Sequence, residues 1–333
     1  MIESNKKEKI AFEVIKTLYL SFDNIPDYPI FDDKSPFNEA FCNAFHNDSV
    51  LNIQHVINSG YGLFGLNTIL VKSFYENMAH ILSDGEKREY TSKKLGNLQI
   101  LKTQKDNIIN IITNLSNSSD EPNLDNENQL LFINDSTTLV NAIDFSADVF
   151  IEDNDRIIAI ELKTVKPNSG EMRGEKQKIL EGKASLYRKF PNKEVSFFIG
   201  FPFDPTSDQD TTYNKTRFLG SIINMTKFFT PDETLIASEL WDFLSGESNT
   251  MEQILEIINV ISTTEFLEKY QFINDCTNRN ELRYTKILQE WNLYSELKLI
   301  NNDNLIRQRI KTDRKLARLY NQKLFDNKGV QYE

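Results

Sequence analysis

Residues 147–165 read ADVFIEDNDRIIAIELKTV, and the strongest prediction about the fold comes from this segment. Residues 147–152 and 156–165 are rich in β-forming side chains, and the turn cluster DND lies between them. Residues 157–160 are apolar without alternation, as in a strand that is covered on both faces. The pattern predicts a β-hairpin that feeds a core strand.

Charged residues appear at the end of the second strand. Glu161 and Lys163 share a face because residues two apart in a strand point to the same side, and Asp148 on the first strand can meet Glu161 across the sheet. Buried ionised groups are costly unless a partner or a metal compensates them, so a cross-strand salt bridge is the alternative interpretation. Phosphodiester hydrolysis needs a metal, and magnesium prefers carboxylate ligands. We therefore interpret Asp148, Glu161 and Lys163 as a candidate catalytic core with Mg²⁺ as the cofactor.

The following residues extend this core. The turn residues 167–170 end the strand, residues 171–190 have the periodicity of a helix, and VSFFIGF at 195–201 reads as a buried strand. A strand, a helix and a second strand in this order predict a parallel crossover. The fold class expected is α/β, with a central mixed sheet flanked by helices.

Four regions are expected along the chain. Residues 1–115 have helical periodicity, with one helix at 95–115, and residues 116–128 form a polar loop or linker. The catalytic core is predicted at 129–235, beginning with a short strand at 130–134, and a helical region at 236–333.

The short catalytic pattern is weak without its context. Glu-Leu-Lys occurs again at 296–298, in a stretch of helical spacing where residues two apart diverge by about 200°. Asp-Asp-Lys at 32–34 also fits the pattern, but no apolar strand precedes it. The strand before Glu161 therefore distinguishes the first copy from these two.

These residues carry a resemblance. Asp148, the hairpin and Glu161-Leu162-Lys163, followed by a helix and a strand, resemble the PD-(D/E)xK core of many type II restriction endonucleases, with Ala147 in place of the proline. More specifically, AIELKTVKPNSGEMRGEKQKILEGKASL at 159–186 resembles the TdeIII/MjaII family of these enzymes.

The resemblance implies an activity and a set of roles. Asp148 and Glu161 would hold the metal, with the Leu162 carbonyl as a further ligand, and Lys163 would orient or help to deprotonate the attacking water and stabilise the pentavalent phosphate. The implied protein is a homodimer that cuts both strands of double-stranded DNA at a short, near-palindromic site of the GGNCC type. A cognate DNA methyltransferase would be encoded separately.

Other residues are candidates for metal or DNA contacts, each against the alternative of an ordinary solvated position. Glu76 is a candidate for an additional helix-borne carboxylate beside the metal. Candidates for phosphate contact on the helix after the catalytic strand are Arg173, Lys176 and Lys183. Candidates for base readout on a projecting loop are Gln209, Asn214, Lys215 and Arg217.

The charge distribution limits the mode of DNA binding. A net charge of −11 argues against a protein that coats nucleic acid indiscriminately, because Lys and Arg drive that kind of binding. Basic residues are nevertheless concentrated locally, ten against four acidic residues at 156–193 and seven against one at 307–323. Local basic patches can serve a polyanion on an acidic protein, although the second patch also fits a solvated helix face.

Cysteine usage and hydropathy indicate the compartment. Cys42 and Cys276 lie far apart in the sequence, which excludes a disulfide framework, and the three histidines, His46, His55 and His80, are interpreted as packing or surface residues. No apolar run approaches the roughly 20 residues of a membrane span, and residues 1–10 lack the apolar segment of a signal peptide. We expect a cytoplasmic protein with no membrane partner.

Three other functions remain open at this point. GYGLFG at 60–65 matches the GxGxxG pattern of dinucleotide-binding enzymes, with Asp84 at the distance of a ribose-binding acid, but the residues before it read as helix. A PD-(D/E)xK nuclease of repair or junction resolution and a non-catalytic DNA-binding module are the alternatives that also involve DNA. The chain has no P-loop motif, which argues against an ATP-driven restriction enzyme.

Overall fold

The computed structural model describes residues 1–23, 35–45, 64–163 and 171–331, with the backbone alone at 64–72. The chain divides into two compact units. The first unit comprises Met1–Ile81 and Glu247–Glu333, and the second comprises Leu82–Gly246. The segment that forms the second unit is thus inserted into the chain of the first.

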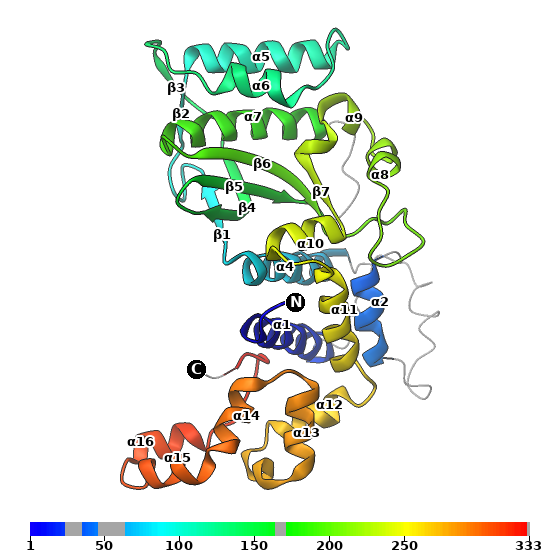
Figure 1. Ribbon diagram of the computed structural model, residues 1–333, viewed down its shortest axis with the longest axis vertical. Helices are drawn as coiled ribbons and strands as arrows, with labels where there is room; N and C mark the ends of the chain where they lie inside the picture. Colours follow the sequence, from blue (N-terminus) through cyan, green and yellow to red (C-terminus); the bar gives the residue numbers. More distant parts are fainter. Residues whose placement is uncertain (24–34, 46–63, 164–170, 332–333) are drawn as a thin grey trace. The chain divides into compact units, whose positions relative to one another are not determined.

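The second unit contains the sheet. Its elements in chain order are β1 (Glu86–Tyr90), β2 (Gln99–Leu101), α5 (Lys102–Ser116), α6 (Leu124–Leu131), β3 (Leu139–Asn141), β4 (Phe145–Glu152), β5 (Arg156–Leu162), α7 (Glu171–Lys189), β6 (Glu194–Phe201), α8 (Lys215–Ser221), α9 (Met225–Phe228), η2 (Pro231–Glu233), β7 (Thr234–Ile236) and α10 (Ser238–Ser245). Five strands form one sheet in the order β1-β4-β5-β6-β7, and β2 pairs with β3 separately (Figure 1). The pairs β1–β4 and β4–β5 are antiparallel, whereas β5–β6 and β6–β7 are parallel. The predicted mixed sheet and the parallel crossover through a helix are confirmed.

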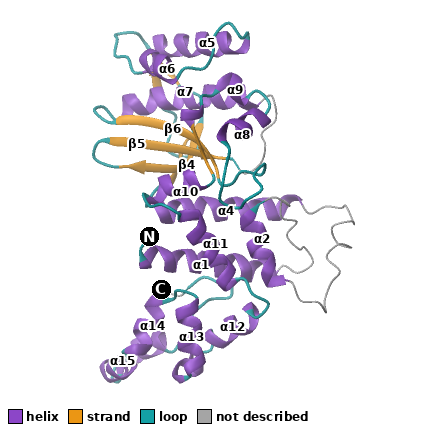
Figure 2. Cartoon of the chain, turned by 45° about the vertical axis from the view of Figure 1, so that its right-hand side comes forward, coloured by secondary structure: helices purple, strands orange, loops and turns teal. Residues whose placement is uncertain are grey.

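Helices α7 and α10 lie on opposite faces of this sheet (Figure 2). Phe198 of β6 packs against Phe243 of α10, with ring centroids 5.5 Å apart. On the other face, a Cβ atom added to Gly182 of α7 would lie 2.8 Å from the ring of Phe197. The missing side chain of Gly182 therefore lets α7 approach the sheet closely. Outside α7, helices α5 and α6 form a further layer, where Ile108, Ile112 and Leu131 pack against Leu180 and Ala184 of α7.

The first unit is helical. Its elements are α1 (Ser4–Asp23), α2 (Pro36–Cys42), η1 (Asn43–Phe45), α4 (Phe64–Ser83), which continues two residues beyond the unit boundary, α11 (Thr250–Ile261), α12 (Phe266–Ile273), η3 (Cys276–Asn280), α13 (Leu282–Glu290), α14 (Tyr294–Asn301), α15 (Asp303–Ile310) and α16 (Arg314–Tyr320). Aromatic contacts connect the N-terminal and C-terminal segments of this unit through α12. The ring of Tyr270 of α12 stacks on that of Tyr19 in α1, with centroids 4.7 Å apart, and on that of Phe325, with centroids 5.2 Å apart.

Several predicted elements differ from the observed ones. The strand expected at 130–134 is wrong, since these residues fall at the end of α6 and in the loop after it, and the helix expected at 95–115 begins only after β2. Strand β1 was not predicted, because EKREY is a polar edge strand without an apolar run. The expected region boundaries at 115, 129 and 235 also do not coincide with the unit boundaries at Leu82 and Gly246.

Among the residues that the structure describes, no helix is long and apolar enough to cross a membrane.

Candidate active site

The two strands of the hairpin bring Asp148 and Glu161 together at one end of the sheet. Val149 pairs with Ile160 across β4 and β5, and the next step of this register places Asp148 opposite Glu161. Opposite residues of an antiparallel pair project from the same face. In addition, Asp148 Oδ2 accepts a hydrogen bond of 3.0 Å from the Leu162 N–H. The placement predicted for these two carboxylates is therefore present.

Strand β4 contains a bulge beside Asp148. The register between β1 and β4 shifts between residues 86 and 88, so that β4 has one extra residue between positions 147 and 150. Bulges redirect nearby side chains and are common next to active sites. The residue opposite the bulge is Lys87, whose Nζ lies 3.1 Å from Asp148 Oδ1. Asp148 is only 2% exposed, so this ammonium compensates a buried charge.

Glu161 and three neighbouring side chains form a closed ring of alternating charge. Lys163 Nζ lies 3.3 Å from Glu161 Oε1 and 2.8 Å from Glu175 Oε1. Lys178 Nζ lies 2.9 Å from the same Glu161 oxygen and 2.7 Å from Glu175 Oε2. All four side chains are 10–20% exposed, so solvent reaches the ring but does not fill it.

The ring shifts the pKa values of two of its members. Burial lowers the pKa of the Lys163 ammonium, but the carboxylates of Glu161 and Glu175 outweigh this effect and raise it above the ordinary value. Burial raises the pKa of Glu175, whereas its hydrogen bonds with Lys163 and Lys178 lower it below the ordinary value overall. Both shifts favour the charged forms that the ring requires.

One oxygen of this site remains available to a ligand. Both lysines contact Oε1 of Glu161, while Oε2 is buried and accepts no hydrogen bond from any described residue. A buried carboxylate oxygen without a donor is costly unless an ion satisfies it. The Leu162 carbonyl belongs to the same neighbourhood, because the N–H and C=O of one strand residue point to the same side and this N–H reaches Asp148.

These donors fit a hard divalent cation. Carboxylate and carbonyl oxygens suit magnesium, which usually retains several water ligands and needs only one or two carboxylates from the protein. No group of three or more His, Cys, Asp or Glu side chains suited to a metal occurs within the described part of the chain. Asp148 and Glu161 thus fit an ion whose coordination is completed by water and phosphate, rather than an all-protein cage.

Sequence reasoning missed Glu175 and Lys178. They lie three residues apart on α7, and this helical spacing places them on one face. The spacing was visible in the sequence, but it also describes many solvated pairs, and only the close approach of α7 to β5 distinguishes this one.

In the second Glu-Leu-Lys copy, the glutamate is a buried residue with a structural role. Glu296 lies on α14, is 3% exposed, and accepts hydrogen bonds from Arg279 Nε at 2.8 Å and from the Tyr284 hydroxyl at 3.1 Å. Lys298, two residues on, is exposed. The helical divergence expected for this copy is confirmed.

Two lysines predicted to contact DNA phosphates are buried. Lys176 is 0% exposed and forms ion pairs with Glu127 at 2.6 Å and with Glu233 at 2.7 Å. Lys183 is 2% exposed, with its ammonium over the ring of Phe132 at 5.9 Å. We correct the prediction for both residues. Both lysines lie close to the apolar stripe of α7, and this position places them in the interior beneath α5 and α6.

The buried charge of Lys183 predicts a measurable effect on stability. Lys183→Met is expected to raise the free energy of unfolding at pH 7 by about 2 kcal/mol, because only the folded state keeps this ammonium away from water. Burial lowers the pKa of Lys183 to about 8, against an ordinary value of 10.5. As the pH rises, the folded wild-type protein therefore loses this proton at a lower pH than the unfolded chain does. Its free energy of unfolding increases between these two pH values. Urea unfolding should show that the free energy of unfolding of Lys183→Met exceeds that of the wild type by less at pH 10 than at pH 7. An equal difference at both pH values would contradict this assignment.

The remaining DNA-contact candidates differ in accessibility. Arg173, Gln209 and Arg217 are exposed and stay candidates, although Arg173 Nε also donates to Ser116 Oγ at 3.2 Å. Asn214 is exposed, but its side chain caps α8 by accepting from the Arg217 N–H. Lys215 is half-buried, and its ammonium contacts two backbone carbonyls and Glu239 at 2.8 Å, which makes it a structural residue here. We therefore correct the base-readout prediction for Lys215.

Two further predictions concern the N-terminal part of the sequence. Glu76 lies on α4 and is half-buried, in the unit that does not contain Asp148 and Glu161. The first four positions of the GxGxxG match at 60–65 lie outside the described residues, and for its last two positions the backbone alone is described.

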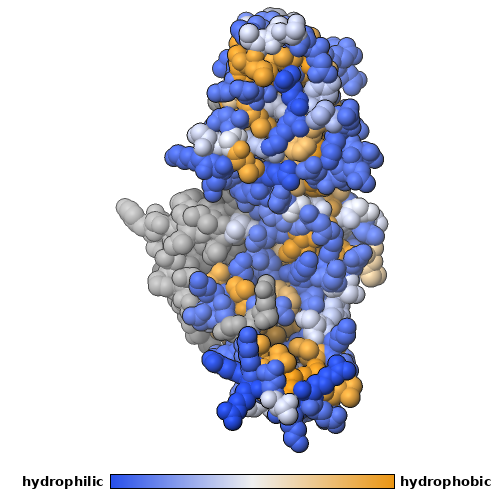
Figure 3. Space-filling view, turned by 90° about the vertical axis from the view of Figure 1, so that its left-hand side faces the viewer, coloured by the Kyte–Doolittle hydropathy of each residue, from blue (hydrophilic) through white to orange (hydrophobic). Residues whose placement is uncertain are grey.

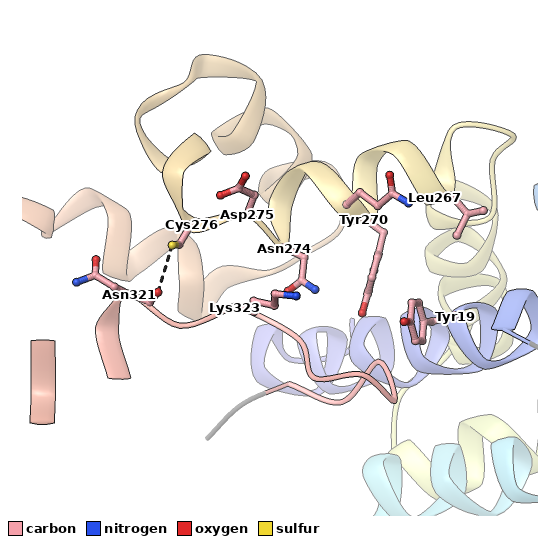
Figure 4. A pocket seen from close by; sticks show the side chains of 9 residues that line it. Tyr19, Leu267, Tyr270, Asn274, Asp275, Cys276, Asn321 and Lys323 are labelled. Atoms are coloured by element: carbon pink, nitrogen blue, oxygen red, sulfur yellow. Dashed lines mark hydrogen bonds between the residues drawn. The ribbon is translucent and has the colours of Figure 1, made fainter. Parts of the chain in front are cut away.

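An open pocket of about 560 Å³ lies in the helical unit (Figure 4). Its polar groups hold the C-terminal segment, since the Cys276 thiol donates to the Asn321 carbonyl at 3.2 Å and Asn274 Oδ1 accepts from the Phe325 N–H at 2.8 Å. The pocket is thus part of the packing of this segment.

Comparisons with known proteins identify the family of the chain. The family model described as type II restriction endonuclease HinfI matches residues 2–262, about three quarters of the chain. The chain belongs to the HinfI family of type II restriction endonucleases. It is also 42% identical to the type II restriction enzyme MjaII of Methanocaldococcus jannaschii, in an alignment that covers 98% of this chain and 94% of that protein. No solved structure gives a significant match.

Membership of the HinfI family decides between the functions left open by the sequence. This family member is a site-specific deoxyribonuclease that acts in a restriction system. The alternatives of a repair or junction-resolving nuclease and of a non-catalytic DNA-binding module are set aside. Type II restriction endonucleases generally use divalent metal ions, and Asp148 of β4 and Glu161 of β5 are carboxylates of the kind that such ions bind.

Proposed function

We propose that this nuclease hydrolyses phosphodiester bonds of double-stranded DNA at a PD-(D/E)xK site, with Mg²⁺ held by Asp148 and Glu161. The observation that carries the proposal is the buried Glu161 Oε2, which accepts no hydrogen bond from a described residue and belongs to a carboxylate opposite Asp148. The Leu162 carbonyl would be a further ligand of the same ion. Glu76 stays a candidate for an additional carboxylate.

Each group of the site has a distinct chemical task. When bound, the magnesium ion would polarise the phosphate and lower the pKa of a water molecule. Lys163 presents an ammonium two residues beyond Glu161, where it can orient the attacking water and stabilise the negative charge of the pentavalent phosphate. The role in deprotonating the water is not kept, because the raised pKa of Lys163 leaves its amine protonated. Lys178 binds Glu161 at Oε1, so Oε2 would be the oxygen that holds the metal. Glu175 binds both lysines and so fixes their positions.

Glu175→Gln is expected to reduce the cleavage rate at saturating DNA by roughly 10- to 100-fold, as loss of a supporting residue around a metal site commonly does. The amide keeps the size of the side chain but no longer attracts the two ammonium groups, so Lys163 and Lys178 lose their fixed positions. Single-turnover cleavage at saturating DNA measures the effect. Glu171→Gln, at an exposed position of the same helix, is the matched control and should cleave at the wild-type rate. Equal rates for both variants would contradict the role of Glu175.

The proposed substrate is a short, near-palindromic duplex site. We infer a homodimer, because two identical sites related by a two-fold axis match the symmetry of such a sequence. Exposed Gln209 and Arg217 are the remaining candidates for base contacts, Asn214 is a weaker one, and Arg173 is a candidate for phosphate contact. A GGNCC-type target, a separately encoded methyltransferase and a cytoplasmic location are further parts of the proposal.

Digestion of plasmid DNA tests this function. Purified protein with Mg²⁺ should give discrete fragments whose sequenced ends share one short motif, and chelation by EDTA should abolish cleavage until Mg²⁺ is restored. Calcium should support DNA binding with little cleavage. Random fragment ends would contradict site-specific cleavage by these residues, and full activity in EDTA would contradict the metal.

A further inference from the structure

Helices α15 and α16 and the turn between them carry a dense group of exposed cations. We define the basic surface by its members: Arg309, Lys311, Arg314, Lys315 and Arg318. All five side chains are exposed, and none has an ion-pair partner among the residues that the structure describes. On a protein with a net charge of −11, this concentration of unpaired positive charge is unusual.

The nearby carboxylates do not neutralise the basic surface. Asp303 binds Arg307 at 2.8 Å and accepts a hydrogen bond from the Tyr320 hydroxyl at 2.6 Å. Asp313 caps α16 and accepts from the backbone N–H groups of Lys315 and Leu316. Both carboxylates thus bind partners within the two helices, and neither forms an ion pair with one of the five cations.

Helices α15 and α16 contribute little to the core. Helix α15 has no buried residue, and α16 has only Tyr320. Tyr320 holds the pair in place, because its ring lies under the Arg279 guanidinium at 4.7 Å and its carbonyl accepts a hydrogen bond from Arg279. Most helices of globular proteins are stabilised by an apolar face packed on the core. Two helices without such a face are better explained by what their exposed side chains bind.

Exposed leucines accompany these cations. Leu305, Leu316 and Leu319 are 59%, 48% and 45% exposed. In Figure 3, a hydrophobic patch flanked by strongly hydrophilic side chains lies at the lower end of the view, over the C-terminal helices. A second copy of the chain is a poor partner for this region, because a two-fold interface would bring two identical basic surfaces together. A polyanion matches the charge.

We propose that the basic surface binds the phosphate backbone of duplex DNA as a sequence-independent anchor. The proposal rests on the proposed DNA-cleaving function, and it adds a contact that lies outside residues 2–262, the segment matched by the family model. Lys and Arg side chains that contact phosphates release counterions, which makes binding depend on salt without specifying a sequence. The leucines can pack against the sugar edges of the same backbone.

The salt dependence of DNA binding tests the anchor. The variant Arg309→Gln/Arg314→Gln/Arg318→Gln keeps helix-forming side chains and removes three charges. Affinity of the full-length protein for a fluorescent duplex that the wild-type enzyme does not cut is measured by anisotropy, without divalent metal, over a series of salt concentrations. The slope of log affinity against log salt should decrease by about 2 to 3, because each lost phosphate contact contributes about 0.9.

A matched control removes the same charge elsewhere. Lys93, Lys286 and Lys328 are exposed, and their triple change to Gln should leave the slope at the wild-type value. An unchanged slope in the Arg309/Arg314/Arg318 variant, or an equal decrease in the control, would overturn the anchor. A shift of the variant from dimer to monomer in light scattering, with its slope retained, would identify a self-association surface and also overturn it.

The proposed DNA-cleaving function and the proposed anchor can be contradicted independently of each other. Cleavage by the anchor variant at saturating DNA should equal that of the wild type, since none of its three residues belongs to the carboxylate site. A wild-type protein that binds DNA with the expected slope but cuts nothing in Mg²⁺ would contradict the proposed function and leave the anchor in place.

Discussion

Glu161→Gln is expected to reduce the rate of DNA cleavage by about a thousandfold or more, since a metal contributes several kcal/mol of transition-state stabilisation. The amide has the size of the carboxylate and can still accept a hydrogen bond from Lys178, but it removes the charge that faces the metal. Glu175 continues to hold both lysines, so the fold should tolerate the change. Single-turnover cleavage of a plasmid with one site measures the rate.

The same variant must remain folded and bind DNA for this result to be informative. Its unfolding midpoint in urea should be close to that of the wild type, and its affinity for DNA in calcium should change by less than the cleavage rate does. Substantial cleavage by the Glu161→Gln protein would contradict the assignment of Glu161 as a metal ligand, whatever the stability of the variant.

Glu296→Ala is expected to lower the free energy of unfolding by about 3 kcal/mol, because breaking a buried ion pair leaves an uncompensated charge. Arg279, 7% exposed, would lose the carboxylate 2.8 Å from its Nε, and the Tyr284 hydroxyl would lose an acceptor. Urea unfolding can be followed by tryptophan fluorescence. Trp291 reports on the helical unit and Trp241 on the sheet unit, so a Trp241→Phe background isolates the relevant signal.

Lys298→Ala is the matched control within the same tripeptide. Its side chain is exposed, and the variant should unfold within about 0.5 kcal/mol of the wild type. Below its unfolding transition, Glu296→Ala should still cleave DNA at nearly the wild-type rate. If Glu296→Ala abolished cleavage while remaining stable, the distinction between the two Glu-Leu-Lys copies would be wrong.

The sequence predicted the centre of the fold because local patterns determine it. Residues 157–160 form a strand that is apolar on both faces, and residues 171–190 have a clear helical period before a second apolar strand. These signals need no long-range information, so β5, α7 and β6 appear where they were expected. The tight turn of the hairpin likewise fixed the register between Asp148 and Glu161.

Long-range contacts explain what the sequence did not reveal. Strand β1 is polar, and only its pairing with β4 and the bulge beside Asp148 give Lys87 a place at the site. Lys176 resembled a surface cation, because its two partners, Glu127 and Glu233, lie about fifty residues away on either side. The pairing of Lys178 with Glu161 likewise depends on Gly182, which allows α7 to approach the sheet.

The location of the metal is the central claim, and iron-directed cleavage of the polypeptide tests it most directly. Fe²⁺ substituted for Mg²⁺ generates radicals with ascorbate and peroxide, and these radicals cut the chain beside the bound ion. We predict cuts near Asp148 and near 161–163 in the wild-type protein, competed by Mg²⁺ and lost in Glu161→Gln. Cuts confined to other segments, or an unchanged pattern in the variant, would contradict the claim.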